Sequence, residues 1–124
     1  MSFIFRRFFS STSTAMSDSA QSKVQQLIDD NAVVVFSKSY CPHCNNSKRL
    51  LDSFGAKYAV YELNQESDGA DIQDALLKIT GQRTVPNIFI GKQHIGGNSD
   101  FKAVVNNGRD GKKIEELLQA ARDI

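Results

Sequence analysis

The chain has only two cysteines, Cys41 and Cys44, and just two residues separate them. Small secreted domains that lack a large core normally carry more cysteines, placed far apart so that their disulfides hold loops together. A bridge between Cys41 and Cys44 would close almost no loop, so it would add little stability by restricting the unfolded chain. The chain must therefore fold around a hydrophobic core, and the pair is predicted to form a disulfide that is made and broken.

The length and composition allow one such core. A chain of 124 residues with 40% hydrophobic residues is too short for two independent domains. The formal net charge of +1 gives no indication of a nucleic-acid partner. No apolar run approaches the roughly 18 to 20 residues needed to cross a bilayer, so no membrane span is predicted. We expect a single monomeric domain without nucleic acid or membrane as a partner.

The first sixteen residues differ in composition from the rest of the chain. They contain Arg6 and Arg7, no acidic residue, several aromatic side chains and a run of serine and threonine. This composition is typical of a mitochondrial transit peptide. We predict that residues 1–16 are a mitochondrial transit peptide or a disordered leader, and that residues 17–124 form the folded domain. A start at Met16 would give a cytoplasmic form of the same domain.

Beyond the leader, the spacing of apolar residues predicts alternating helices and strands. Helices are expected from Asp18 onward, from Pro42 to a left-handed Gly55, over Ile72–Ile79 ending at Gly81, from Asn98 to about Asn106, and over Ile114–Ala121. Strands are expected over Ala32–Phe36, Tyr58–Leu63, Asn87–Ile90 and Gln93–Ile95, the last two joined by a turn at Gly91-Lys92. This order predicts an α/β fold with a central mixed sheet.

Short polar residues indicate where two of these helices begin. Asp18 or Ser19 is expected to cap the first helix, because their side-chain oxygens can accept a hydrogen bond from a free backbone N–H group. Asn98 or Ser99 is expected to cap the fourth helix for the same reason.

The run Cys41-Pro42-His43-Cys44 opens the second predicted helix. Disulfide exchange requires a thiolate, and an ordinary cysteine, with a pKa of about 8.5, is only a few per cent ionised near neutrality. At a helix N-terminus, free N–H groups and the helix dipole favour negative charge, and Lys38 and His43 can add positive potential. The spacing predicts Cys41 as a nucleophile with a lowered pKa. Cys44, one turn further in, is predicted to be the more buried resolving thiol with a higher pKa.

The same pair is half of a potential zinc site. A complete structural site needs four ligands, and His43 and His94 are the only histidines in the chain. Such a site would require every cysteine and histidine that the chain has. We therefore predict no metal.

Three motifs together resemble the dithiol glutaredoxins, especially the fungal ones. They are Lys38-Ser39-Tyr40-Cys41-Pro42-His43-Cys44, Gly81-Gln82-Arg83-Thr84-Val85-Pro86 and His94-Ile95-Gly96-Gly97-Asn98-Ser99-Asp100. The resemblance covers roughly Ser22 to Ala120. It implies the thioredoxin fold, an α/β fold with a central four-stranded mixed sheet flanked by about five helices. It also implies that residues 17–124 are a glutaredoxin domain.

The resemblance also implies a site for glutathione. It implies a cis peptide bond between Val85 and Pro86, which would present the backbone of Val85 to an extended peptide. The residues that it implies for glutathione binding are Lys38, Tyr40, Cys41, His43, Gln73, Arg83, Thr84, Val85, Pro86, Gly97, Ser99 and Asp100.

The charges of glutathione suit several of these residues. The resemblance places Lys38 and Gln73 near its glycine carboxylate, and Arg83 can add positive charge. It places Ser99 and Asp100 at the γ-glutamyl end. There, free N–H groups of a helix start would bind the carboxylate, and Asp100 would meet the ammonium group.

At one position the chain departs from most dithiol glutaredoxins, which carry tyrosine where His43 stands. The run Cys-Pro-His-Cys also occurs in the periplasmic oxidant DsbA, whose reduction potential is about −120 mV. We therefore expect His43 to make Cys41 more acidic. We also expect it to make the disulfide easier to reduce than a tyrosine would.

The resemblance implies a glutathione-dependent thiol-disulfide oxidoreductase that reduces protein-glutathione mixed disulfides and protein disulfides. Glutathione would be the reducing co-substrate, without a permanently bound cofactor. One alternative is a thioredoxin-like or DsbA-like oxidoreductase, although the chain has no tryptophan beside the cysteines and no room for the extra helical domain of DsbA. Another is a module that binds an iron-sulfur cluster through Cys41 and glutathione, which Pro42 is expected to restrict.

Overall fold

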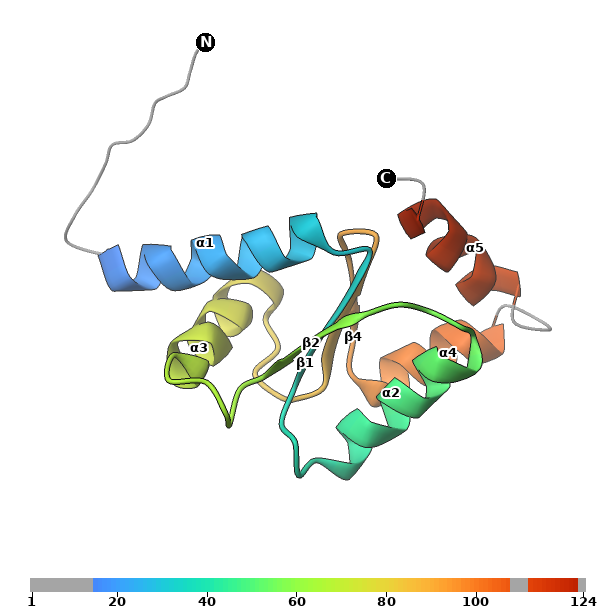
Figure 1. Cartoon of the computed structure of the whole chain (residues 1–124), viewed down its shortest axis with the longest axis horizontal. Coiled ribbons are helices and arrows are strands. Elements are labelled where there is room, and N and C mark those ends of the chain that lie inside the picture. Colours follow the sequence, from blue (N-terminus) through green and yellow to red (C-terminus); the bar gives the residue numbers. More distant parts are fainter. Residues whose placement is uncertain (1–14, 108–111, 123–124) are drawn as a thin grey trace, which may run out of the picture.

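The computed structural model describes residues 15–107 and 112–122, shown as coloured ribbon in Figure 1. Its helices are α1 (Ala15–Asp30), α2 (Pro42–Ser53), α3 (Gly69–Thr80), α4 (Asn98–Asn107) and α5 (Lys112–Arg122). Its strands are β1 (Val33–Ser37), β2 (Ala59–Glu62), β3 (Asn87–Ile90) and β4 (Gln93–Gly96). The predicted order of helices and strands is confirmed. None of the described helices is long and apolar enough to span a membrane.

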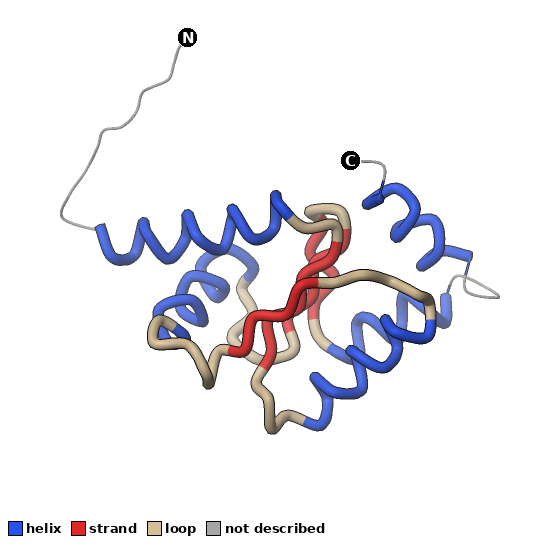
Figure 2. Tube along the Cα trace, viewed as in Figure 1, coloured by secondary structure: helices blue, strands red, loops and turns tan. Residues whose placement is uncertain are grey.

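The strands form one mixed sheet in the order β2-β1-β3-β4. Strand β1 pairs in parallel with β2 and antiparallel with β3, and β3 pairs antiparallel with β4. Figure 2 shows the strands crossing the middle of the molecule between two groups of helices. Helices α1 and α3 pack together on one side, and α2, α4 and α5 lie on the other (Figure 1). This confirms the four-stranded mixed sheet with five flanking helices.

Strand β1 is buried on both faces. Val34 and Phe36 belong to the core shared with α1 and α3, whereas Val33 and Val35 belong to the core shared with α2, α4 and α5. This alternation is the two-residue repeat of a strand, and cover on both sides explains why the strand sequence is continuously apolar. Full burial of each such side chain contributes about 1.5–3 kcal/mol to folding. The strand ends at Ser37, one residue later than predicted.

Three predicted turns or helix ends have the expected backbone conformation. Gly55 and Gly81, which follow α2 and α3, have φ values of +68° and +80°. Gly91 and Lys92 have φ values of +57° and +70°. Positive φ at both central residues is characteristic of the type I′ turn, whose twist matches that of the two hairpin strands.

The predicted start of α1 is wrong. The helix begins at Ala15, so Asp18 and Ser19 lie inside it and do not cap it. Alanine and methionine have high helix propensity, and they extend the helix toward the N-terminus. The helix thus includes the last two residues of the predicted leader. Residues 1–14 lie outside the described residues, and the transit peptide stays a prediction.

Candidate active site

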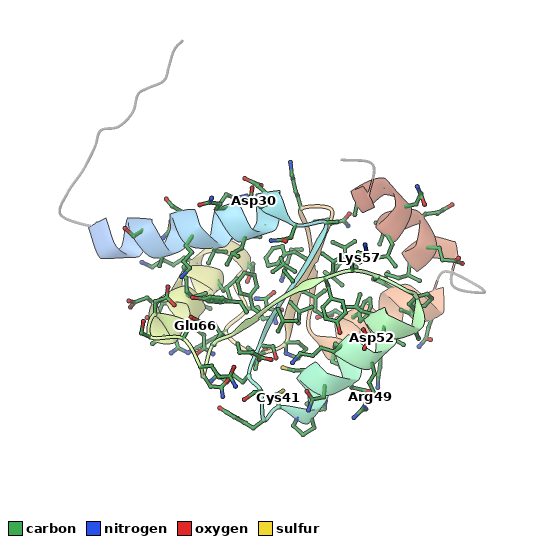
Figure 3. The ribbon with its side chains drawn as sticks, in the orientation of Figure 1. Asp30, Cys41, Arg49, Asp52, Lys57 and Glu66 are labelled. Carbon is green, nitrogen blue, oxygen red and sulfur yellow. The ribbon has the colours of Figure 1, made fainter. Side chains whose placement is uncertain are left out.

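Cys41 occupies the N-cap position of α2, at the end of the short loop that follows β1. Its backbone is extended, and its Sγ accepts a hydrogen bond from the backbone N–H of Cys44 at 3.3 Å. Pro42 follows in the first helical turn, where its missing N–H is not needed. The N–H group and the positive end of the helix dipole both favour negative charge on this sulfur. Figure 3 labels Cys41 at the edge of the molecule, where α2 begins.

Cys44 lies one turn further along α2 and is fully buried, whereas Cys41 is half-buried. Burial and, to a smaller extent, the interaction with the Cys41 sulfur together raise the pKa of the Cys44 thiol to about 11. Cys44 is therefore protonated at neutral pH. This confirms that Cys44 is the more buried thiol, and its pKa lies above that of an ordinary cysteine. Both cysteines are free thiols in this structure.

The loop before β3 lies against the first cysteine. The peptide bond between Val85 and Pro86 is cis, as the resemblance implied. The carbonyl oxygen of Val85 is 4.0 Å from the Sγ of Cys41. The side chain of Gln82 holds this loop, because its Nε2 donates to the carbonyl oxygens of Thr84 and Pro86, each at 3.0 Å.

Gln82 was not among the predicted site residues. Its acceptors are backbone oxygens in an irregular loop, and no residue type or spacing in the sequence indicates such contacts. Its own backbone N–H donates to the Oγ1 of Thr80 at 3.0 Å, which anchors the residue to the end of α3.

A groove of about 490 Å³ lies beside this loop. It is lined by seven of the predicted residues and by two others: His43, Thr84, Val85, Pro86, Gly97, Ser99 and Asp100, with Gln82 and Asn98. The groove thus joins the first turn of α2, the cis-proline loop and the start of α4. Another hollow of about 470 Å³ lies where β1 begins, and its lining contains no cysteine or histidine. The groove beside Cys41 is therefore the candidate active site.

The predicted caps of α4 are wrong, because Gly97 takes that position. The carbonyl oxygen of Gly97 accepts the first helical hydrogen bond, from the N–H of Phe101 at 2.9 Å. Its N–H donates to the Oδ2 of Asp100 at 3.0 Å, which is one half of a capping box. The N–H groups of Asn98, Ser99 and Asp100 then have no acceptor within the helix, and they can bind an anion.

The side chain of Asn98 joins two helices. Its Oδ1 accepts a hydrogen bond from the Oγ of Ser47, a buried residue of α2, at 2.7 Å. This contact fixes the start of α4 beside α2, the helix that contains Cys44 and is preceded by Cys41. The sequence did not indicate it, since the partners are 51 residues apart.

Five predicted site residues are not part of the groove lining in the described structure: Lys38, Tyr40, Cys41, Gln73 and Arg83. Tyr40 precedes Cys41 and is 69% exposed. The Nε2 of Gln73 donates to the carbonyl oxygen of Arg83 at 2.7 Å. Arg83 in turn forms an exposed ion pair with Asp74 at 2.8 Å. The carbonyl oxygen of Lys38 accepts the N–H of Cys41 at 3.0 Å, which shapes the turn before α2.

Residues 15–107 and 112–122 contain no group of three or more His, Cys, Asp or Glu side chains suited to a metal ion. His94, which a zinc site would have required, pairs instead through Nε2 with the Oδ1 of Asn87 at 2.8 Å. Burial lowers the pKa of His94, and the nearby carboxylate of Asp100 acts in the opposite direction.

Comparisons with known proteins point to one family. The family model described as Glutaredoxin matches residues 33–95. A glutaredoxin of Ricinus communis is 57% identical over 90 residues, which are 73% of this chain and 88% of that protein. Glutaredoxin-1 of Rhizophagus irregularis is 44% identical over 95 residues, 77% of this chain and 94% of that protein. The plant relative is the more similar of these two, so the similarity extends beyond the fungal proteins.

The structure is also similar to a crystal structure of a buckwheat glutaredoxin-glutathione complex. The TM-score is 0.78 and the sequence identity is 49%, over 89% of this chain and 96% of the buckwheat chain.

Proposed function

The chain belongs to the glutaredoxin family and is a glutathione-dependent thiol-disulfide oxidoreductase, and we propose that Cys41 and Cys44 carry its reaction at the groove described above. The observation that carries this assignment is the asymmetry of the two thiols. Cys41 accepts the N–H of Cys44 at the start of α2, at the edge of the groove. Cys44 is buried behind it, with a pKa raised to about 11. One sulfur is thereby suited to attack and the other to remain protonated until needed.

With a protein-glutathione mixed disulfide, Cys41 acts alone. Its thiolate attacks the glutathione sulfur, the protein thiolate leaves, and a Cys41-glutathione disulfide forms. A second glutathione thiolate then attacks this disulfide, which releases oxidised glutathione and restores the Cys41 thiolate. The protons balance, because each attacking thiolate has released one proton and each leaving thiolate takes one up.

With a protein disulfide, both cysteines are needed. Cys41 attacks one sulfur of the substrate and forms a mixed disulfide with it. Cys44 then attacks the Cys41 sulfur, which releases the reduced protein and leaves a Cys41–Cys44 disulfide. Two molecules of glutathione reduce this disulfide and become oxidised glutathione.

The groove offers complementary groups to each end of glutathione. We assign the γ-glutamyl carboxylate to the free N–H groups at the start of α4. We assign the ammonium group to Asp100, whose Oδ2 already accepts the N–H of Gly97. The backbone of Val85 would pair with the cysteinyl residue of glutathione, because this loop lies against Cys41. The solved complex of the buckwheat relative with glutathione supports this use of the groove.

The glycine carboxylate is assigned to Lys38, Gln73 and Arg83. One N–H of the Gln73 amide donates to the carbonyl oxygen of Arg83, which leaves the second one for the carboxylate. The ion pair between Arg83 and Asp74 is exposed. Such pairs contribute only about 0–1 kcal/mol, so Arg83 can exchange this partner for glutathione at little cost.

Replacing Cys44 by serine should separate the two activities. Cys44→Ser should retain reduction of a small glutathione mixed disulfide, since only the sulfur of Cys41 is attacked in that cycle. It should lose reduction of a protein disulfide, because nothing resolves the mixed intermediate. Both rates are measured by coupling glutathione oxidation to glutathione reductase.

The wild-type protein, assayed in parallel, should perform both reactions. A wild type inactive with glutathione and glutathione reductase would contradict the proposed function. Loss of both activities in Cys44→Ser would instead show that Cys44 takes part in the deglutathionylation cycle.

Replacing His43 by tyrosine should make the disulfide harder to reduce. His43 is exposed in the first turn of α2 and lines the groove, where its protonated form would add positive potential near the sulfur of Cys41. An exposed pair of opposite charges contributes about 0.2–1 kcal/mol, so the equilibrium constant with glutathione should change by up to about fivefold. Quantifying thiols and disulfides in glutathione redox buffers measures the change. An unchanged equilibrium would show that His43 does not tune the disulfide.

A further inference from the structure

Ser37, the last residue of β1, has a buried hydroxyl group that the steps above do not use. Its side chain is fully buried, and its Oγ has no hydrogen-bond partner in the described structure. Buried polar groups in proteins are nearly always paired, because an unpaired one has lost its hydrogen bonds to water. An unpaired hydroxyl at this depth is available to donate to a neighbouring group that gains charge in another state of the protein.

The strand geometry directs this hydroxyl toward α2. Val33 and Val35 lie in the core shared with α2, and alternate residues of a strand share a face, so Ser37 projects from that same face. Helix α2 turns its buried side, which includes Cys44 and Leu51, toward the sheet. Ser37 and Cys44 therefore face each other at the end of β1.

The two groups are close enough to interact. The Ser37 hydroxyl and the backbone N–H of Lys38 both lower the pKa of Cys44, although burial has the larger and opposite effect. The hydroxyl makes no hydrogen bond of ordinary geometry with the reduced, neutral thiol. Glu62 is the register partner of Ser37 in β2, and its Oε2 forms an ion pair with Lys48 at 2.7 Å. Its other oxygen, Oε1, is also buried without a hydrogen-bond partner in the described structure. Ser37 is thus the side-chain hydroxyl that faces the resolving sulfur.

We propose that the Ser37 hydroxyl donates a hydrogen bond to the Cys44 sulfur while this sulfur carries negative charge, as the Cys41–Cys44 disulfide is reduced. A reductant thiolate attacks the Sγ of Cys41 and forms a new disulfide with it. The Cys41–Cys44 bond breaks, and its electron pair leaves on Cys44. This sulfur is shielded from water, so hydrogen bonds from Ser37 and from the N–H of Lys38 stabilise it until it takes up the proton released by the reductant. The inference rests on the proposed role of Cys44 as the resolving thiol.

Replacing Ser37 by alanine tests the proposal. In Ser37→Ala, the preformed disulfide should be reduced by glutathione or dithiothreitol about tenfold more slowly, the expected effect of losing one hydrogen bond to a charged group. The pKa of Cys44 should rise, which NMR titration of its Cβ measures in a Cys41→Ser background. The reduced protein should keep its thermal stability, because the hydroxyl that is removed has no partner there. An unchanged reduction rate would overturn the proposal.

Two further variants separate this role from a structural one. Ser53→Ala removes an exposed hydroxyl at the other end of α2 and should leave the reduction rate unchanged. Ser37→Thr keeps the hydroxyl and should retain most of the rate. In a Cys44→Ser background, where the leaving sulfur is absent, Ser37→Ala should have no effect on deglutathionylation. An equal slowing there would overturn the proposal.

The use of dithiothreitol keeps this test independent of the proposed function. This reagent reduces the Cys41–Cys44 disulfide whether or not the protein uses glutathione. Slow reduction of Ser37→Ala by dithiothreitol supports the role of Ser37 even if the coupled glutathione assay fails. A normal rate with dithiothreitol overturns it even if that assay succeeds.

Discussion

Replacing Cys41 by serine should reduce both activities to the rate of the uncatalysed exchange between glutathione and the disulfide. A serine hydroxyl is a weak nucleophile unless a base accepts its proton, and the two hydrogen-bond partners that the described structure gives the Cys41 sulfur are backbone groups, the N–H of Cys44 and the carbonyl oxygen of Val85. Cys44 cannot replace Cys41, because it is fully buried and protonated at neutral pH. The coupled glutathione reductase assay, run with a small mixed disulfide and with a protein disulfide, measures both losses.

This substitution should leave the fold intact, which makes the result easy to interpret. Cys41 occupies an N-cap position, where serine is among the preferred residues, so α2 should be as stable as in the wild type. Thermal unfolding followed by circular dichroism provides the control. Catalysis by a well-folded Cys41→Ser well above the uncatalysed rate would mean that another group is the nucleophile.

Replacing Gly69 by alanine should cause a large loss of stability. Gly69 is the first residue of α3 and is buried against the segment after β2. A Cβ atom at this position would lie 1.8 Å from the carbonyl oxygen of Leu63 and 2.8 Å from its carbonyl carbon. These are backbone atoms, so the helix start must move to relieve the overlap. Overpacking of this kind typically costs about 1–3 kcal/mol, and we expect at least the upper value because no flexible side chain can yield.

Gly81→Ala is the matched control, since it makes the same change at the other end of α3. Beyond its chain neighbours, no described atom lies within 4 Å of the position of its Cβ, and the strain comes from a φ of +80°. Occupying the left-handed region costs about 1–2 kcal/mol for an ordinary residue. Urea unfolding of both variants compares the two losses. If Gly69→Ala were no less stable than Gly81→Ala, the close contact with Leu63 would not be a constraint.

The order of helices and strands and the hairpin turn were predicted correctly from local sequence. The order of elements followed from apolar spacing, and the hairpin turn followed from Gly91-Lys92, because helix and strand periods and turn residues act over a few positions. The burial of Cys44 was also predicted, since Cys44 lies one turn further into the helix than the N-cap residue Cys41.

The cap positions show where local reasoning was insufficient. Asn98 has a side chain that caps helices well, yet this side chain bonds to Ser47 on α2, and Gly97 takes the cap. The contact with α2, a helix that is distant in the sequence, therefore decides which residue caps α4. The residues that hold the cis-proline loop were missed for a similar reason, because Gln82 bonds to backbone oxygens whose placement depends on the whole loop.

The amino-acid sequence by itself predicted two thiols at the start of a helix, and it suggested the separate role that we propose for each. The tertiary structure alone decided what surrounds them. It buried the hydroxyl of Ser37 without a partner, and it brought Gly69 against Leu63. The physical reason is the distance along the chain over which each interaction acts. Periodicity, helix caps and dipoles act within a few residues, whereas a buried partner or a close backbone contact exists only after distant segments have packed together.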